Sequence, residues 1–168
     1  MPIAASLLPE FDNEMKNTRA LLARVPDALA SWKPHAKSMT MGQLAIHLPG
    51  LVSWVPAIMS GTELDVTGPM GREMNPAWES QEKMLAAFDA ALPAARAAIA
   101  GATDDALMVP WTLKAGSHVV FTMPRVAVLR TAVMNHIIHH RGQLGVYLRI
   151  NDVPLPEIYG PTADSARF

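Results

Sequence analysis

The chain contains no cysteine among its 168 residues. Disulfide bonds, thiolate metal ligands and a cysteine nucleophile are therefore all excluded. Charged residues are also sparse, at 17% of the sequence, and 14 basic side chains nearly balance 15 acidic ones to give a formal net charge of −1. No run of basic residues is available to follow a phosphate backbone, so we expect no nucleic-acid partner.

Long hydrophobic runs are missing as well. The longest apolar stretch, residues 44–59, is interrupted by two prolines, a histidine and a serine, and it is too short and too broken to span a bilayer. Residues 1–6 lack the basic and apolar regions of a signal peptide. We therefore expect a cytoplasmic protein with no membrane partner. Half of the residues are hydrophobic, which predicts one domain, 1–168, with a sizeable core.

Four segments carry apolar residues at the spacing of three or four that amphipathic helices show. The second has the clearest start, because Thr40 and Gln43 can form a capping box, and Gly61 marks its end. The four predicted helices cover residues 6–29, 41–60, 76–100 and 124–150.

Prolines interrupt this helical pattern. Pro49 and Pro56 lie inside the second segment and Pro93 inside the third, and each predicts a kink or a division of its helix. Residues 61–76 are rich in Gly, Pro, Thr and Asn and predict a loop. Residues 111–121 place β-branched and aromatic residues around a short turn, which predicts a β-hairpin. The predicted fold is all-α, a four-helix bundle with a small β-hairpin before the last helix.

The most informative motif is a pair of histidines in the last predicted helix. His136 and His140 lie one turn apart, which places their Cβ atoms about 5–6 Å from each other. Both fall on the apolar stripe of that helix, and His47 falls on the apolar stripe of the second helix. A buried imidazole loses about 1–3 kcal/mol for each nitrogen without a partner, and a metal ion can satisfy one of the two nitrogens. Hydrogen bonding within the core is the alternative.

Other known metal signatures are absent from the sequence. Position 137 is Ile, so there is no His-Glu-x-x-His motif. No acidic residue lies between Asp105 and Asp152, which excludes the Glu-x-x-His pair of di-iron bundles in the last helix. A mononuclear centre of three histidines remains, and it suits Zn²⁺, Ni²⁺ or Fe²⁺. His35 and His118 are interpreted as ordinary surface or turn histidines.

Five segments of the chain form a characteristic set, namely Trp32–His35, Met41–His47, Asn135–Gln143, Gly145–Arg149 and Pro154–Asp164. They span most of the sequence, and the part from the last helix into the tail is the most specific. Together these segments resemble the DinB/YfiT-like family of metalloenzymes.

This resemblance implies a four-helix bundle with a metal site held by His47, His136 and His140. It also implies a homodimer, which members of the family often form. Characterised relatives include metal-dependent transferases that use low-molecular-weight thiols such as mycothiol or bacillithiol. A small-molecule or thiol substrate is therefore expected.

Three hypotheses remain open from the sequence. The first is a metal-dependent enzyme, either a thiol-dependent S-transferase or a hydrolase, in which the metal lowers the pKa of a bound thiol or water. The second is a metal- or small-molecule-binding protein without catalysis, and the third is a helical dimer whose histidines are structural. No residue stands out as a general base, and His139, Glu82 and Tyr159 are weak candidates.

Overall fold

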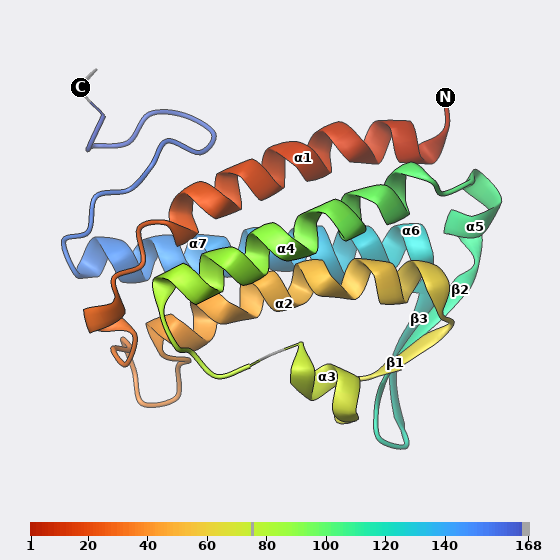
Figure 1. Cartoon of the computed structure of the whole chain (residues 1–168), viewed down its shortest axis with the longest axis horizontal. Helices are drawn as coiled ribbons and strands as arrows, with labels where there is room; N and C mark the ends of the chain where they lie inside the picture. Colours follow the sequence, from red (N-terminus) through yellow and green to blue (C-terminus); the bar gives the residue numbers. More distant parts are fainter. Residues whose placement is uncertain (75, 166–168) are drawn as a thin grey trace.

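A computed structural model describes residues 1–74 and 76–165. Four long helical segments lie side by side along the molecule (Figure 1). Helices α1 and α2 each pack against both α4 and the last helical segment, as in a four-helix bundle. The predicted helical bundle is confirmed. The four segments are α1 (Ile3–Leu22), α2 (Met41–Ser60), α4 (Gln81–Ala100) and the run α6 (Arg125–Val128), η2 (Leu129–Asn135) and α7 (His136–Ile150).

Helix α2 begins where the sequence predicts. The Thr40 side chain accepts a hydrogen bond from the Gln43 N–H at 3.2 Å, and the Gln43 side chain accepts one from the Thr40 N–H at 2.8 Å. Of the two outcomes predicted at Pro49 and Pro56, a kink or a division of the helix, the division is wrong, because α2 continues through both prolines. Most α2 residues are buried, and this packing outweighs a cost of about 3 kcal/mol for each proline. Pro93 likewise lies inside a continuous α4.

Two predicted helix ends also differ from the structure. Helix α1 ends at Leu22, seven residues before the predicted end, and a short 3₁₀ turn, η1 (Asp27–Leu29), follows. Pro26 explains this end, because a proline disfavours helical backbone at the residue before it. Helix α4 starts at Gln81, since the Ser80 hydroxyl accepts a hydrogen bond from the Lys83 N–H and caps the helix.

The segment predicted as a loop contains regular structure. It holds a short strand, β1 (Glu63–Asp65), and a short helix, α3 (Pro69–Glu73). The predicted β-hairpin is present as β2 (Pro110–Ala115) and β3 (His118–Pro124), which pair antiparallel. Strand β1 pairs parallel with β2, so the hairpin belongs to a three-stranded sheet in the order β1-β2-β3.

The sheet packs at one end of the bundle, next to the N-terminus and to α5 (Asp104–Met108) (Figure 1). At the turn between β2 and β3, Gly116 has a φ of +62°, a left-handed conformation that glycine adopts without strain. The Asp65 carboxylate accepts a hydrogen bond from the Gly116 N–H at 3.0 Å. This bond ties β1 to the hairpin turn.

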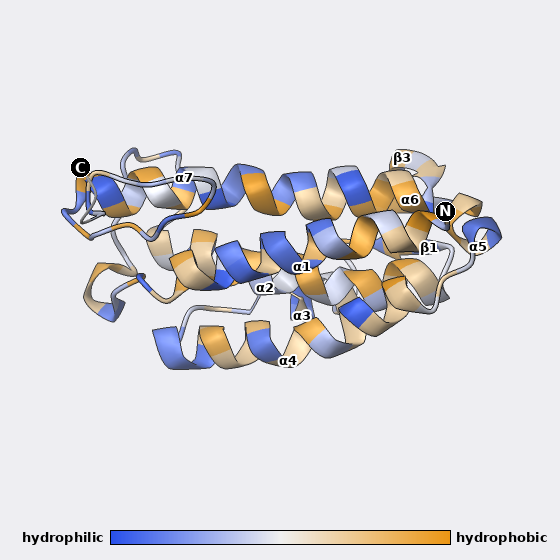
Figure 2. Ribbon diagram, turned by 90° about the horizontal axis from the view of Figure 1, so that it is seen from above, coloured by the Kyte–Doolittle hydropathy of each residue, from blue (hydrophilic) through white to orange (hydrophobic). Residues whose placement is uncertain are grey.

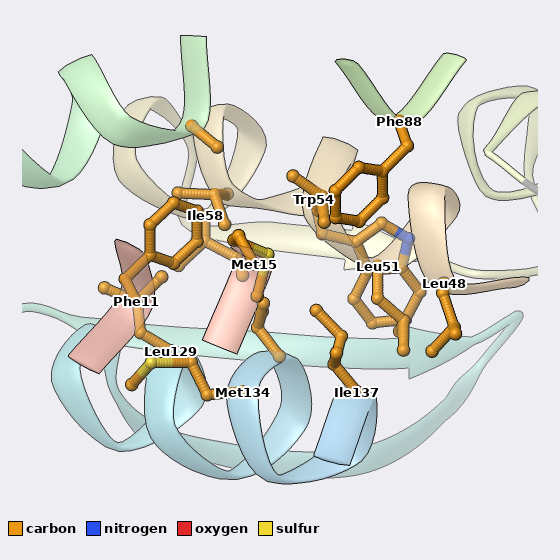
Figure 3. Close-up of a cluster of buried hydrophobic side chains, with 14 of the residues drawn as sticks. Phe11, Met15, Leu48, Leu51, Trp54, Ile58, Phe88, Leu129, Met134 and Ile137 are labelled. Carbon is orange, nitrogen blue, oxygen red and sulfur yellow. The ribbon is translucent and has the colours of Figure 1, made fainter. Parts of the chain in front are cut away.

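All four long helical segments contribute side chains to one apolar core (Figure 3). Phe11 from α1, Leu51 from α2, Phe88 from α4 and Ile137 from α7 are all buried there. Polar residues lie on the outer faces of the helices (Figure 2). Helix α2 is long and apolar enough to cross a membrane, yet 72% of its apolar window is buried inside the bundle. Its composition is that of a core helix.

Candidate metal centre

The three predicted histidines meet between α2 and α7. One ring nitrogen from each of His47, His136 and His140 lies within 4.8 Å of the others, and all three side chains are partly buried. The ring centroid of His47 lies 5.2 Å from that of His136 and 4.9 Å from that of His140. The apolar stripes of two separate helices therefore correctly predicted that these three histidines lie together.

A neighbouring glutamine fixes the orientation of His140. The Nδ1 atom of His140 lies 2.8 Å from Oε1 of Gln143, one turn further along α7. An amide oxygen only accepts hydrogen bonds, so Nδ1 carries the hydrogen and Nε2 keeps its lone pair. This role of Gln143 was not predicted from the sequence, although its spacing of three residues from His140 is a usable signal in a helix.

The π-helical segment η2 orients His136 in a similar way. The main-chain N–H of His136 donates to the carbonyl of Val133, three residues earlier. The Ala132 carbonyl, which an α-helix would pair with that N–H, accepts a hydrogen bond from the His136 side chain. Wide π-turns often occur at functional sites. Here the π-turn supplies a main-chain acceptor for the imidazole.

These two contacts point both Nε2 atoms at the same place. The Nε2 of His136 lies 2.8 Å from the Nε2 of His140. The Nδ1 of His140 carries that ring's hydrogen, so its Nε2 presents a lone pair toward the Nε2 of His136. Neutral imidazoles held by an acceptor on the far nitrogen are the usual ligands of transition metals. The donor set therefore fits a metal ion.

Burial keeps these rings neutral. Burial, together with smaller contributions from charge repulsion by His140 and His47, lowers the pKa of His136 to about 4. Burial also lowers the pKa of His140, while its bond to Gln143 opposes that shift. Both rings consequently hold lone pairs at neutral pH, which is the state that a metal ligand requires.

A cavity of about 570 Å³ opens beside His47. This volume lies within the range of about 300–1,000 Å³ that ligand pockets show. Its walls are mainly apolar, and Gln43 adds an amide to them. The other lining residues are Met39, Ile46, Pro76, Ala77 and Trp78.

The weak candidates for a general base lie outside the histidine cluster. His139 is exposed, with its ring centroid 5.0 Å from that of His140, and Glu82 is exposed in the first turn of α4. Tyr159 is engaged elsewhere, since its hydroxyl donates to Glu14 at 2.7 Å. Among the histidines outside the cluster, His118 is exposed at the start of β3.

A buried ion pair between α1 and α7 was not predicted from the sequence. Arg141 contacts the Glu14 carboxylate at 2.6 Å, and the two side chains are only 3% and 7% exposed. The Arg141 guanidinium also donates to Thr18 and to the Tyr159 hydroxyl. The pair joins α1 to the helix that carries two of the three histidines.

Comparisons with known proteins agree with this architecture. A DinB-like protein from Bacillus cereus has a similar structure, with a TM-score of 0.70 and 26% identity, over 94% of this chain and 98% of that chain. The DinB-like protein YjoA from Bacillus subtilis shares the fold with a TM-score of 0.68 and 18% identity, over 93% of this chain and 99% of that chain. Among curated proteins, none matches. The family model of the DinB superfamily matches residues 10–144, which include all three clustered histidines, and the chain belongs to this superfamily.

Proposed function

We propose that the protein is a metal-dependent enzyme whose His47, His136 and His140 bind one divalent transition metal ion. We further propose that it transfers a low-molecular-weight thiol to a small electrophile. The observation that supports metal binding best is the convergence of one ring nitrogen from each of the three partly buried histidines within 4.8 Å of one another, with the two Nε2 atoms of α7 only 2.8 Å apart.

The composition of the cluster supports thiol chemistry. Among the described residues, the cluster holds three histidines and no carboxylate. Neutral ligands do not cancel the charge of a divalent ion, so the site attracts an anion. A bound ion supplies positive charge that lowers the pKa of a thiol or a water molecule.

The protein side chains position the reactants in this proposal. Gln143 holds His140, and the Ala132 carbonyl holds His136, so neither imidazole has to reorient when a substrate arrives. The cavity beside His47 offers Met39, Ile46 and Trp78 as an apolar wall for an uncharged electrophile. In the transfer, the thiol sulfur forms a bond to carbon, the leaving group departs with the electron pair, and the thiol proton passes to solvent.

Turnover of a model electrophile tests this function. Protein purified without a His-tag is loaded with Zn²⁺, Ni²⁺ or Fe²⁺, and thiol addition to monochlorobimane is followed by fluorescence with bacillithiol, mycothiol or cysteine. We expect metal-dependent turnover that His136→Ala abolishes. His118→Ala is the matched control, because it removes an exposed histidine in β3 and should leave the rate unchanged.

Two other functions give different results in the same experiment. A metal-dependent hydrolase would cleave ester substrates and leave thiols unconsumed. A metal- or small-molecule-binding protein would take up the ion without any turnover. Among the described residues the histidine cluster includes no general base, which is consistent with this alternative. Absence of turnover with every thiol and metal, in protein that binds the ion, would favour the non-catalytic function.

The expected assembly and compartment also remain proposals. We propose a homodimer in the cytoplasm. Light scattering of the purified protein tests the dimer, and a mass of one chain at micromolar concentration would contradict it.

A further inference from the structure

A second cavity, of about 320 Å³, lies against the opposite face of α7. Ile138, Arg141 and Gly145 line it from α7. At about 100° per residue, these positions lie on the other side of the helix from His136 and His140. The cavity is therefore separate from the candidate metal centre.

The C-terminal tail forms the outer wall of this cavity. The tail crosses over α7 beside the end of α1 (Figure 1), and Leu155, Ile158 and Tyr159 line the cavity from the tail. Asp164 fastens the tail, because its carboxylate accepts hydrogen bonds from Arg149 at 2.5 and 3.1 Å and from the Leu155 N–H at 2.9 Å. The wall is thus held in place by the tail's own contacts.

Two glycines of α7 form the floor of the cavity. A Cβ atom added at Gly142 or Gly145 would meet no heavy atom within 4 Å, and both residues line the cavity. A helix that contains glycine at an interior position is less stable than one that contains alanine there. At Gly142 and Gly145 no neighbouring atom would clash with a Cβ, so close packing does not explain the two glycines. The glycines leave the helix backbone open to close approach from the cavity.

One N–H group of Arg141 has no hydrogen-bond partner among the described residues. Its side chain is 3% exposed, and four of its five N–H groups donate to Glu14, Thr18 and Tyr159. For the fifth, on Nε, the structure gives no partner within residues 1–74 and 76–165. This Nε is not one of the fully buried side-chain atoms without a partner, so one hydrogen-bond donor of Arg141 stays accessible beside the cavity that Arg141 lines.

We propose that this cavity binds a small uncharged molecule with an apolar body and one carbonyl-type acceptor. The mainly apolar walls suit the body, and the Nε–H of Arg141 suits the acceptor. The Glu14 carboxylate already balances the charge of Arg141 at 2.6 Å, so an anionic ligand would gain no net attraction and would lie close to a second negative charge. The ligand class is that of small ketones, esters and amides.

Titrations of the full-length protein by NMR, with and without Zn²⁺, test the proposal. Acetophenone is the probe, ethylbenzene has the same shape without the acceptor, and benzoate carries a charge. We expect acetophenone to shift the amide signals of Gly142 and Gly145 saturably. Ethylbenzene should bind about fivefold more weakly, since it lacks one hydrogen bond, and benzoate should also bind more weakly.

Two variants connect the binding to the cavity. Gly145→Leu fills the cavity and should weaken acetophenone binding by roughly tenfold or more, whereas Val146→Leu changes an exposed neighbour and should have no effect. If Gly145→Leu does not fold, as judged by circular dichroism, Gly142→Ala narrows the cavity with less change and should weaken binding in the same direction.

Three results would overturn the proposal. They are the absence of saturable shifts at the two glycines, equal binding by the wild type and the cavity-filling variant, and shifts confined to the cavity beside His47. Shifts that depend on protein concentration and not on acetophenone would instead identify a second copy of the chain as the occupant, which also contradicts the proposal.

Discussion

Removing one charge from the buried ion pair between α1 and α7 should lower the free energy of unfolding more than removing a charge from an exposed pair. Glu14→Gln keeps the shape of the side chain but leaves Arg141 as a buried cation without its carboxylate partner. Both side chains are almost completely excluded from water, at 3% and 7% exposure. Removing one member of such a pair costs about 3–5 kcal/mol, which is a large part of the 5–15 kcal/mol that typically stabilises a domain.

A matched control lies one turn earlier on the same helix. Glu10 pairs with Arg130 of the last helical segment, but these side chains are 33% and 47% exposed. Glu10→Gln should therefore cost only about 0–1 kcal/mol, as surface ion pairs do. The two substitutions are chemically identical and differ mainly in the burial of the pair.

Urea unfolding followed by circular dichroism measures both effects. With a slope of about 1–3 kcal/mol per molar urea, Glu14→Gln should lower the midpoint by about 2 M and leave the slope unchanged. A double variant, Glu14→Leu with Arg141→Met, should recover most of the loss, because it leaves no buried charge. Equal and small losses for Glu14→Gln and Glu10→Gln would show that burial does not make the Arg141–Glu14 pair critical for stability.

Three further predictions concern the helices and the histidines. Gly142→Ala should stabilise the protein by about 0.5–1 kcal/mol, since its Cβ meets open space, and thermal unfolding should show a rise in Tm. Gly42→Ala should lower Tm, because its Cβ would lie 2.9 Å from the Trp78 ring. Metal-free protein should lose stability as the pH falls from about 7 to about 4. In the unfolded chain His136 takes up a proton near its ordinary pKa of 6.5, whereas in the folded protein it does so only at about 4. A His136→Ala variant whose stability depended equally steeply on pH would contradict this cause.

Much of the fold could be predicted from local patterns. The Thr40 and Gln43 capping box, the helical stripes and the hairpin each depend on neighbouring residues, and all are present. The prolines in α2 left both a kink and a division open in the prediction, because tertiary packing decides whether a helix survives a missing hydrogen bond. Strand β1 was missed for a related reason, since a three-residue strand is defined by its partner β2 and has no periodicity of its own.

The histidine cluster could be predicted in part. Helical spacing placed His136 and His140 on one face, and the separate stripe of α2 placed His47 opposite them. The orientation of the rings could not be predicted, because it depends on the π-turn that presents the Ala132 carbonyl to His136. The Arg141–Glu14 pair was missed because its members lie 127 residues apart and meet only when α1 packs on α7.

The metal content of tag-free protein shows whether His47, His136 and His140 bind an ion. After reconstitution with Zn²⁺, Ni²⁺ or Fe²⁺ and removal of unbound ion, elemental analysis should find about one ion per chain in the wild type. His118→Ala, which changes an exposed histidine outside the cluster, should bind the same amount. Gln143→Leu should weaken binding by about 10–100-fold, because it frees the far nitrogen of His140.

His47→Ala, His136→Ala and His140→Ala should each lose the ion and keep the helical circular dichroism of the wild type. A wild type that holds far less than one ion per chain for every metal, or a His118→Ala variant that loses as much metal as His136→Ala, would contradict the three-histidine metal centre.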